Sequence, residues 1–265
     1  MTGSENLLEA LFERDLFSHF GTMLSGFVHN INGPLHNISL LADRISKNHQ
    51  ELNQLIDSEK SDHSEALQNL SLNQLQRLEQ LVHQVSILTN MVHDFRILQD
   101  MVRHQPKVDL NLVLSKLVEI SRSDRLVKYE IDVQLHLTKN LPLIPIPGSK
   151  LVPALMHLLQ NALNAVREAE QKKVVIESQK DGDRVRVIFR DSGCGFSANQ
   201  KQEAFFELFY VNWPENLNAE SEPKYSGFGL YSVRELLRPY GAEVTLRREG
   251  RETFAVMEIP LVSLR

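Results

Sequence analysis

The sequence of 265 residues has a single cysteine, a small net charge and no long apolar run. One cysteine, Cys194, cannot form an internal disulfide, which fits a chain that works in a reducing compartment. Lys and Arg number 29 against 34 Asp and Glu, so no basic excess favours nucleic acid or anionic lipid as a partner. The polar start, Met1 to Asn6, does not resemble a signal peptide, and no stretch is apolar enough to span a bilayer. We therefore expect a cytoplasmic chain of about two domains, with no nucleic acid partner and no membrane contact of its own.

Apolar residues at heptad spacing near the start of the chain predict one long helix from about Ser4 to Asn53. A polar stretch with turn-forming residues, 56–64, follows this helix. A second long helix comes next, because apolar residues again recur at spacings of three and four over several turns. The apolar positions are Leu24, Ile31, Ile38 and Ile45 with Phe20, Phe27, Pro34 and Leu41 in the first helix, and Leu78, Leu81, Val85, Leu88, Val92 and Phe95 in the second.

Two long helices joined by a short turn form an antiparallel hairpin. One hairpin cannot bury the apolar stripes of both helices well, so we expect a second copy to complete a four-helix bundle in a homodimer. A hairpin that packs only on its own C-terminal domain is the alternative. The heptad spacing ends at Pro106, and we place a helical domain at residues 1–105 and a second domain at 106–265.

His29 stands in the first helix, in the stretch Phe27-Val28-His29-Asn30-Ile31-Asn32-Gly33-Pro34-Leu35. The heptad pattern places His29 on the face turned away from the apolar stripe and toward solvent. Gly33 follows one turn later on the same face, and Pro34 can bend the helix axis. The imidazole is therefore open to a large partner, although a solvated surface histidine is the ordinary explanation.

From residue 106 onward the pattern changes to short helices and alternating segments. It predicts an α+β sandwich with a mostly antiparallel sheet, because strands and helices alternate and one strand pair flanks the turn Asp181-Gly182-Asp183. The expected helices are Leu110 to Ser121, Ser149 (as the cap) to about Glu170, a short one near Gln200 to Phe206, and Leu230 to Pro239; the expected strands are Val127 to Leu137, Lys173 to Ser178, Arg184 to Phe189, Glu243 to Arg248 and Thr253 to Ile259.

Three short motifs follow one another in this second domain. Asn161 places an amide on an otherwise apolar helix, and Asp191-Ser192-Gly193-Cys194-Gly195 comes directly after a strand. Ser226-Gly227-Phe228-Gly229-Leu230 opens a helix, where free backbone N–H groups and the helix dipole favour a phosphate. Each motif alone has an ordinary structural explanation: a buried or capping Asn, a turn, and glycines at a helix start. We interpret Cys194 as a space-filling residue between two glycines.

Together and in this order, the motifs resemble the N, G1 and G2 boxes of the GHKL ATP-binding domain, the Bergerat-type α/β sandwich of sensor histidine kinases, Hsp90 and type II topoisomerases. Phe206-Glu207-Leu208-Phe209 is similar to the F box of that family. With His29 on a helical hairpin upstream, the chain from about Phe20 onward resembles the core of a histidine kinase.

The resemblance implies that His29 is the nucleophile that attacks the γ-phosphate of ATP, with Asn30 orienting its imidazole. Asp191 would accept a hydrogen bond from the amine of adenine, and Asn161 would hold Mg²⁺ through its amide oxygen. The phosphoryl group would pass to an aspartate in the receiver domain of a separate response regulator. The implied ATP-binding residues are Asn161, Asp191, Gly193, Gly195, Phe206, Phe209, Gly227, Gly229 and Leu230, with ATP and Mg²⁺ as cofactors.

Two departures from the family pattern affect the expected activity. The family often has an acid after the histidine to help take up the imidazole proton, and Asn30 is a poor base. Gly33 stands where kinases that are also phosphatases often have Thr or Asn. A catalytically weak or inactive nucleotide-binding scaffold of the same fold is therefore the alternative. A chaperone-type or topoisomerase-type ATPase is opposed by Leu158, which stands near where those enzymes have a catalytic glutamate. His157, at the head of the N box, either contacts phosphate or packs inside the domain.

Overall fold

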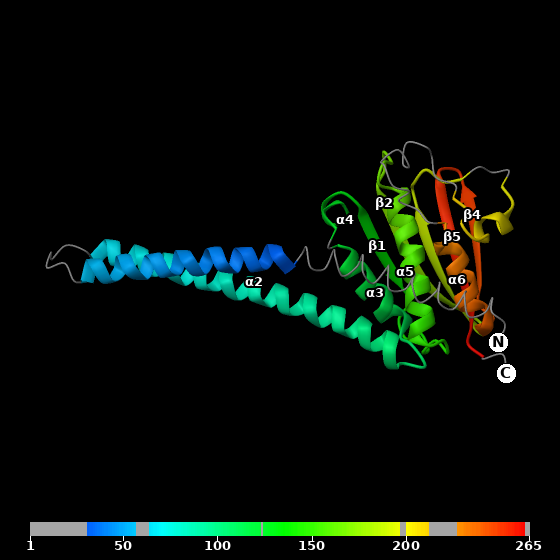
Figure 1. The fold of residues 1–265 in the computed structure, drawn as a ribbon, viewed down its shortest axis with the longest axis horizontal. Coiled ribbons are helices and arrows are strands. Elements are labelled where there is room, and N and C mark those ends of the chain that lie inside the picture. Colours follow the sequence, from blue (N-terminus) through cyan, green and yellow to red (C-terminus); the bar gives the residue numbers. More distant parts are fainter. Residues whose placement is uncertain (1–30, 57–63, 123, 197–199, 212–226, 263–265) are drawn as a thin grey trace. The chain divides into compact units, whose positions relative to one another are not determined.

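The computed structural model describes residues 31–56, 64–122, 124–196, 200–211 and 227–262 (Figure 1). Its contacts divide the chain into two compact units, Leu24–Phe95 and a unit that contains Arg96–Arg265. The long helix α2 (Ser64–His104) contributes to both units. His29 and Asn30 lie outside the described residues. Among those described, no helix has the length and apolar character needed to span a bilayer.

The first unit is the predicted antiparallel helical hairpin. One helix occupies residues 31–56 without a break at Gly33 or Pro34, and α2 packs against it. The side chain of Asn37 donates to Gln84 at 3.5 Å, and the Arg77 guanidinium donates to the carbonyl of Arg44 at 3.1 Å. The residue numbers of the contacting pairs rise along one helix and fall along the other, so the two helices run antiparallel.

The predicted apolar series of α2 splits into two stripes. Leu81 and Leu88 are half-buried, and they follow the face that packs within the unit. Leu78, Val85 and Val92 are exposed instead. A straight helix has about 3.6 residues per turn, so positions spaced by three and four residues shift gradually around its surface. A series of this length therefore contributes to more than one face. The exposed stripe on α2 consists of Leu75, Leu78, Val82, Val85 and Val92.

The second unit is an α+β sandwich, as predicted. Its five strands lie in the order β1-β2-β3-β5-β4; β1 pairs with β2 in parallel, and the other neighbours are antiparallel. Three helices pack against one face of this sheet and against each other (Figure 1). The helices are α3 (Leu110–Ser121), α5 (Gly148–Ala165) and α6 (Gly229–Leu237), and the strands are β1 (Asp132–Leu137), β2 (Lys173–Asp181), β3 (Arg184–Asp191), β4 (Glu243–Glu249) and β5 (Glu252–Pro260).

Several predicted boundaries in this unit are wrong. The strand expected from Val127 begins only at Asp132, because a short helix, α4 (Arg125–Tyr129), comes first. The side chain of Asp124 caps α4 by accepting from the N–H of Leu126 at 2.8 Å, and Val127 is buried. The apolar helix begins at Gly148 with no side-chain cap from Ser149, and it ends at Ala165 instead of near Glu170.

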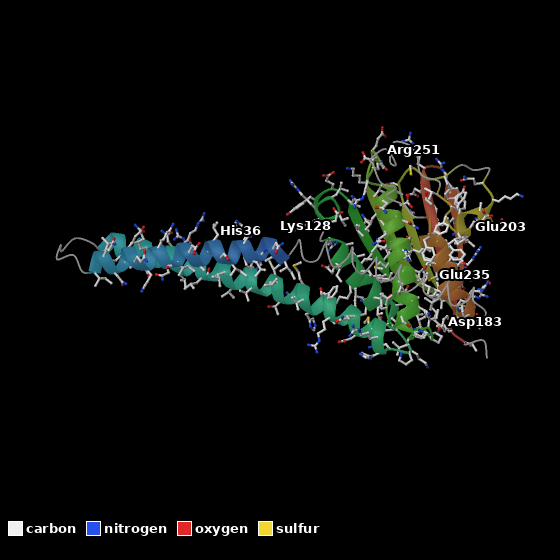
Figure 2. The ribbon with its side chains drawn as sticks, viewed as in Figure 1. His36, Lys128, Asp183, Glu203, Glu235 and Arg251 are labelled. Atoms are coloured by element: carbon white, nitrogen blue, oxygen red, sulfur yellow. The ribbon has the colours of Figure 1, made fainter. Side chains whose placement is uncertain are left out.

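The last turns of α2 belong to this second unit. Leu98 and Met101 are buried there, and the N–H of Gly148, where α5 begins, donates to the carbonyl of Gln105 at 2.9 Å. The division of the chain into functional domains at residues 105 and 106 stays a prediction. Charged side chains such as Asp183, Glu203 and Arg251 cover the outside of the unit (Figure 2).

Candidate functional site

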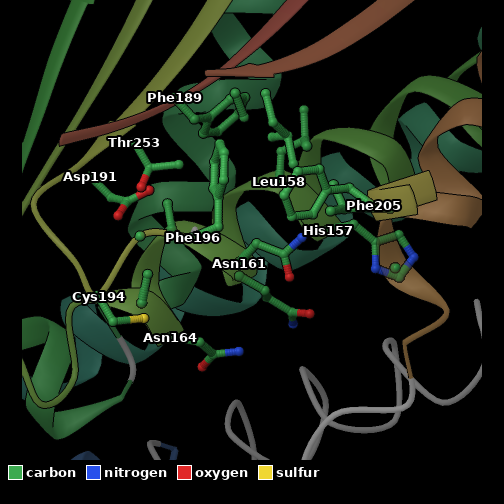
Figure 3. Close-up of a pocket in the computed structure, with 18 of the residues that line it drawn as sticks. His157, Leu158, Asn161, Asn164, Phe189, Asp191, Cys194, Phe196, Phe205 and Thr253 are labelled. Carbon is green, nitrogen blue, oxygen red and sulfur yellow. The ribbon is translucent and has the colours of Figure 1, made fainter. Parts of the chain in front are cut away.

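A cavity of about 230 Å³ opens in the second unit beside α5 (Figure 3). Its lining comes from segments that are far apart in the sequence: α5, the end of β3 with the turn after it, the short 3-10 helix η1 (Gln202–Phe206), the start of α6, and β4 and β5. The predicted motifs around Asn161, Asp191 and Gly227 therefore meet at one place.

Asp191 is the last residue of β3 and only 6% exposed. Side chains on this strand alternate between the two faces of the sheet, so Asp191 falls on the helix-covered face with Val187 and Phe189. Burial raises the pKa of Asp191 from 3.8 to about 7, and the charge of Glu252 adds to the increase. A hydrogen bond from the backbone N–H of Gly193, at 3.0 Å, and the side chain of Thr253 nearby act in the opposite direction. Once ionised, this carboxylate is a hydrogen-bond acceptor for a ligand in the cavity.

Glycine is required at two points around the cavity because the backbone comes too close to other backbone for a side chain. A Cβ atom at Gly193 would lie 2.5 Å from the carbonyl carbon of Ala165, at the end of α5. At Gly227, which has a φ of +66°, a Cβ would lie 2.4 Å from the carbonyl carbon of Phe209. The two glycine motifs thus let the turns pack directly onto the elements that frame the cavity.

Three polar side chains share one face of α5. His157, Asn161 and Asn164 are spaced by four and three residues, so they lie above one another on the helix. The amide groups of Asn161 and Asn164 point away from the sheet (Figure 3). His157 is buried, and a Cβ atom at Gly229 would lie 3.3 Å from its Nδ1 atom.

The amide oxygens of Asn161 and Asn164 are of the hard type that Mg²⁺ prefers. Within the described ranges, no group of three or more His, Cys, Asp or Glu residues is placed to hold a metal ion. A divalent ion at this face of α5 would thus need oxygen atoms of a bound ligand, and the donors present fit an ion that arrives together with phosphate groups.

Aromatic rings form another wall of the cavity. The ring of Phe196 lies 4.6 Å from that of Phe205 between centroids, and Phe205 lies 5.9 Å from Tyr210, both in edge-to-face arrangements. Phe189 lines the cavity from β3 (Figure 3). This wall offers apolar contact to a flat ring, next to the carboxylate of Asp191.

Most predicted ATP-binding residues line the cavity, namely Asn161, Asp191, Gly195, Gly227, Gly229 and Leu230. Gly193, Phe206 and Phe209 are not among the lining residues. Gly193 packs behind the wall on Ala165, Phe206 is buried in a cluster with Phe205 and Leu246, and the Phe209 side chain is 63% exposed. The predicted catalytic residues His29 and Asn30 lie outside the described residues.

Sequence reasoning missed several lining residues. Asn164 follows Asn161 by three positions, which is a helical spacing that could have marked it. Thr253 is paired with Asp191 in the β3–β5 register, which no motif in the sequence indicates. Cys194, interpreted above as a space-filler, lines the cavity with an exposed side chain. Partial burial raises the pKa of the Cys194 thiol, which disfavours the reactive thiolate.

Residues 148–263 match the protein family model described as histidine kinase-, DNA gyrase B-, and HSP90-like ATPase. This match agrees with the family that the motifs resemble. Two curated relatives, both named sensor histidine kinase ZraS and from Salmonella typhi and Salmonella typhimurium, are each 23% identical over 261 residues. The alignment covers 97% of this chain and 49% of each relative, so the chain spans about half the length of the curated relatives it matches.

Solved histidine kinase structures are also similar to this chain. The catalytic domain of ThkA has a TM-score of 0.48 and 20% identity, covering 58% of this chain and 93% of that one. Full-length ShkA, solved with AMPPNP, has a TM-score of 0.48 and 19% identity over 87% of this chain and 46% of its own. ThkA solved with the response regulator TrrA has a TM-score of 0.46 and 18% identity, with coverage of 99% and 68%.

Proposed function

We propose that the protein is a histidine protein kinase of a two-component signalling system. It binds Mg-ATP in the cavity beside α5, phosphorylates His29, and passes the phosphoryl group to an aspartate of a separate response regulator. The observation that carries the proposal is the buried Asp191, which faces a cavity that Asn161 and both glycine motifs also line, inside a segment of the matched ATPase family.

The cavity suits an adenine nucleotide. The ionised Asp191 accepts a hydrogen bond from the exocyclic amine of adenine, while Phe196 and Phe205 contact the ring. The phosphates extend toward Gly227 and Gly229, where the free N–H groups at the start of α6 favour negative charge. Asn161 would hold Mg²⁺, with Asn164 as a second amide nearby, and such an ion would supply charge neutralisation to the phosphate groups.

His29 is proposed as the nucleophile. An imidazole nitrogen attacks the γ-phosphorus, the bond to the leaving oxygen of ADP breaks, and the imidazole loses its proton. Two features of the same hairpin support an accessible histidine. Open space surrounds Gly33, one turn after His29, where an added Cβ would have no neighbour within 4 Å. His36, seven residues after His29 and thus at the same heptad position, is exposed (Figure 2).

A homodimer is part of this proposal. The exposed stripe on α2 (Leu75, Leu78, Val82, Val85 and Val92) is spaced by three, four, three and seven residues, which fits the heptad spacing that pairs helices in bundles. A second copy that covers this stripe would complete a four-helix bundle. We place this kinase in the cytoplasm, where its single thiol stays reduced and ATP is available.

The test is the incorporation of γ-labelled phosphate from Mg-ATP into purified protein. We expect an acid-labile label that is lost in His29→Ala and in Asp191→Asn and retained in the matched control His36→Ala. A protein that binds ATP in calorimetry and takes up no label would instead support the scaffold, which the substitution of Asn30 for the usual acid favours. Failure to bind ATP at all would contradict both candidates.

A further inference from the structure

Strand β4 is an edge of the sheet, and a side chain from outside the sheet occupies part of that edge. The Nε2 group of Gln202, the first residue of η1, donates to the carbonyl of Leu246 in β4. The N–H of Leu246 donates in return to Oε1 of Gln202 at 3.1 Å. One amide side chain thus satisfies both backbone groups of Leu246, as the next strand of a sheet would.

Arg248 makes a second connection two residues further along the same strand. Its Nη1 group donates to the carbonyl of Phe196 at 2.6 Å, and its Nε group donates to the carbonyl of Gly250 at 3.2 Å. The guanidinium therefore joins the turn that follows β3 to the turn between β4 and β5. Gln202 and Arg248 together connect η1 and Phe196 to one edge strand.

The aromatic wall of the cavity depends on these two connections. Phe196 is bonded through its own carbonyl, and Phe205 lies three residues after Gln202 on η1. Phe205 and Phe206 are buried against Leu246, the residue that Gln202 contacts, and Phe196 and Tyr210 pack on this cluster. Apolar contact alone is non-directional, so the rings could slide along β4; hydrogen bonds to fixed backbone atoms set their position.

We propose that Gln202 and Arg248 are positioning residues for nucleotide binding. Their hydrogen bonds fix the aromatic wall of the cavity in place against β4. The inference rests on the proposed function, because it takes the cavity to be the adenine site. Neither side chain contacts the reacting atoms. Their loss weakens nucleotide binding and leaves the rate of the chemical step nearly unchanged.

The experiment combines Gln202→Leu, which removes both hydrogen bonds, with Gln202→Glu, which keeps the acceptor for Leu246 and loses the donor. Gln179→Leu, at an exposed position on β2, is the matched control. Binding of a fluorescent ATP analogue to the full chain, KM and kcat for phosphorylation, and hydrogen exchange of the Leu246 amide are measured for each. Exchange at Val187, in the central strand β3, reports whether the sheet stays intact.

For Gln202→Leu we expect about tenfold weaker binding and a similar rise in KM, with kcat within about twofold of the wild type. The Leu246 amide exchanges faster and Val187 stays protected. Gln202→Glu falls between the wild type and Gln202→Leu, whereas Gln179→Leu matches the wild type. Arg248→Met gives a similar loss, and the double variant loses less than the product of the two because both residues hold one wall.

Faster Leu246 exchange with unchanged affinity and KM would overturn the proposal, because the Gln202 amide would then be a structural bond alone. A drop in kcat as large as the rise in KM would also overturn it, since the wall would then act in the chemical step. Failure of the wild type to bind the analogue would instead refute the nucleotide site, and the positioning role with it.

Discussion

Thr253 lies directly opposite Asp191, where the start of β5 pairs with the end of β3. Its side chain lowers the pKa that burial raises at this carboxyl. The two residues are 62 positions apart in the sequence, and only the strand register brings them together. The pKa of Asp191 is therefore lowered by a residue of the neighbouring strand β5 as well as by the N–H of Gly193 in the turn after β3.

The first prediction concerns the pH dependence of nucleotide binding. In the proposed site, the ionised form of Asp191 is the stronger hydrogen-bond acceptor for the amine of adenine, and the pKa of Asp191 is about 7. ATP affinity should consequently rise as the pH increases from 6 to 8, and calorimetry at the two pH values measures the difference. Thr253→Val should move this rise to higher pH because the hydroxyl group that favours the charged form is lost. Thr253→Ser keeps a hydroxyl and should restore the wild-type profile; identical profiles for all three proteins would contradict the assignment.

The second prediction concerns stability in the absence of nucleotide. The pKa of Asp191 is raised in the folded state, from 3.8 to about 7, so the folded protein binds more protons than the unfolded chain between these values. The stability associated with the neutral acid is thus complete below pH 3.8 and is lost as the pH rises to 7. Asp191→Asn, which carries no charge, should be more stable than the wild type at pH 8, by up to about 4 kcal/mol, and less so at pH 5.

Thermal unfolding at the two pH values measures this difference. Asp183→Asn, at the turn between β2 and β3, is the control for removing a carboxylate elsewhere on the unit. An equal gain at both pH values would mean that the neutral amide packs better for reasons unrelated to ionisation.

The third prediction concerns a buried amide in the hairpin. Asn48 is 5% exposed, and its Nδ2 group has no hydrogen-bond partner within the described part of the chain. Asn48→Leu should raise the free energy of unfolding by about 1 to 2 kcal/mol, since a buried donor without a partner is destabilising. Denaturant unfolding measures the change, with the exposed Asn53→Leu as the control. A loss of stability would contradict this prediction.

The fourth prediction tests the dimer through the exposed stripe on α2. Val82 is 65% exposed, and its replacement in Val82→Glu would place a charge in the middle of a four-helix bundle. We expect the dissociation constant of the dimer to rise at least about 100-fold in sedimentation experiments, while helix content stays the same. His83→Glu, on an exposed position outside the stripe, should leave the dimer intact. A dimer that resists Val82→Glu would exclude this face as the interface.

The fifth prediction concerns Asn30. Asn30→Glu supplies the base that Asn30 cannot, so it should accelerate phosphorylation of His29 by about 10-fold or more without changing ATP affinity. Label incorporation over time measures the rate, and Asn30→Gln controls for side-chain length. An unchanged rate would show that the proton leaves to another group.

The helical hairpin, the sandwich and the grouping of three distant motifs could be predicted from the sequence, because they depend on spacing that the chain itself carries. Asp191 after an apolar strand and Asn161 on an apolar helix are examples. The aromatic wall could not be predicted, since Phe205 and Phe206 are adjacent in the sequence. Only the 3-10 geometry of η1 and its bonds to β4 decide that Phe205 lines the cavity and Phe206 does not. Likewise, Val127 continues the apolar alternation of β1 in the sequence, but it lies in the helix α4, which the side chain of Asp124 caps.

The raised pKa of Asp191 also has a practical use. A ligand that donates a hydrogen bond to this carboxylate removes a penalty that the empty domain bears above neutral pH, whereas a ligand bound elsewhere does not. The melting-temperature increase caused by such a ligand should therefore be larger at pH 8 than at pH 6. A thermal-shift screen run at both values would separate compounds that bind beside Asp191 from compounds that bind other surfaces, before any activity assay or crystal is in hand.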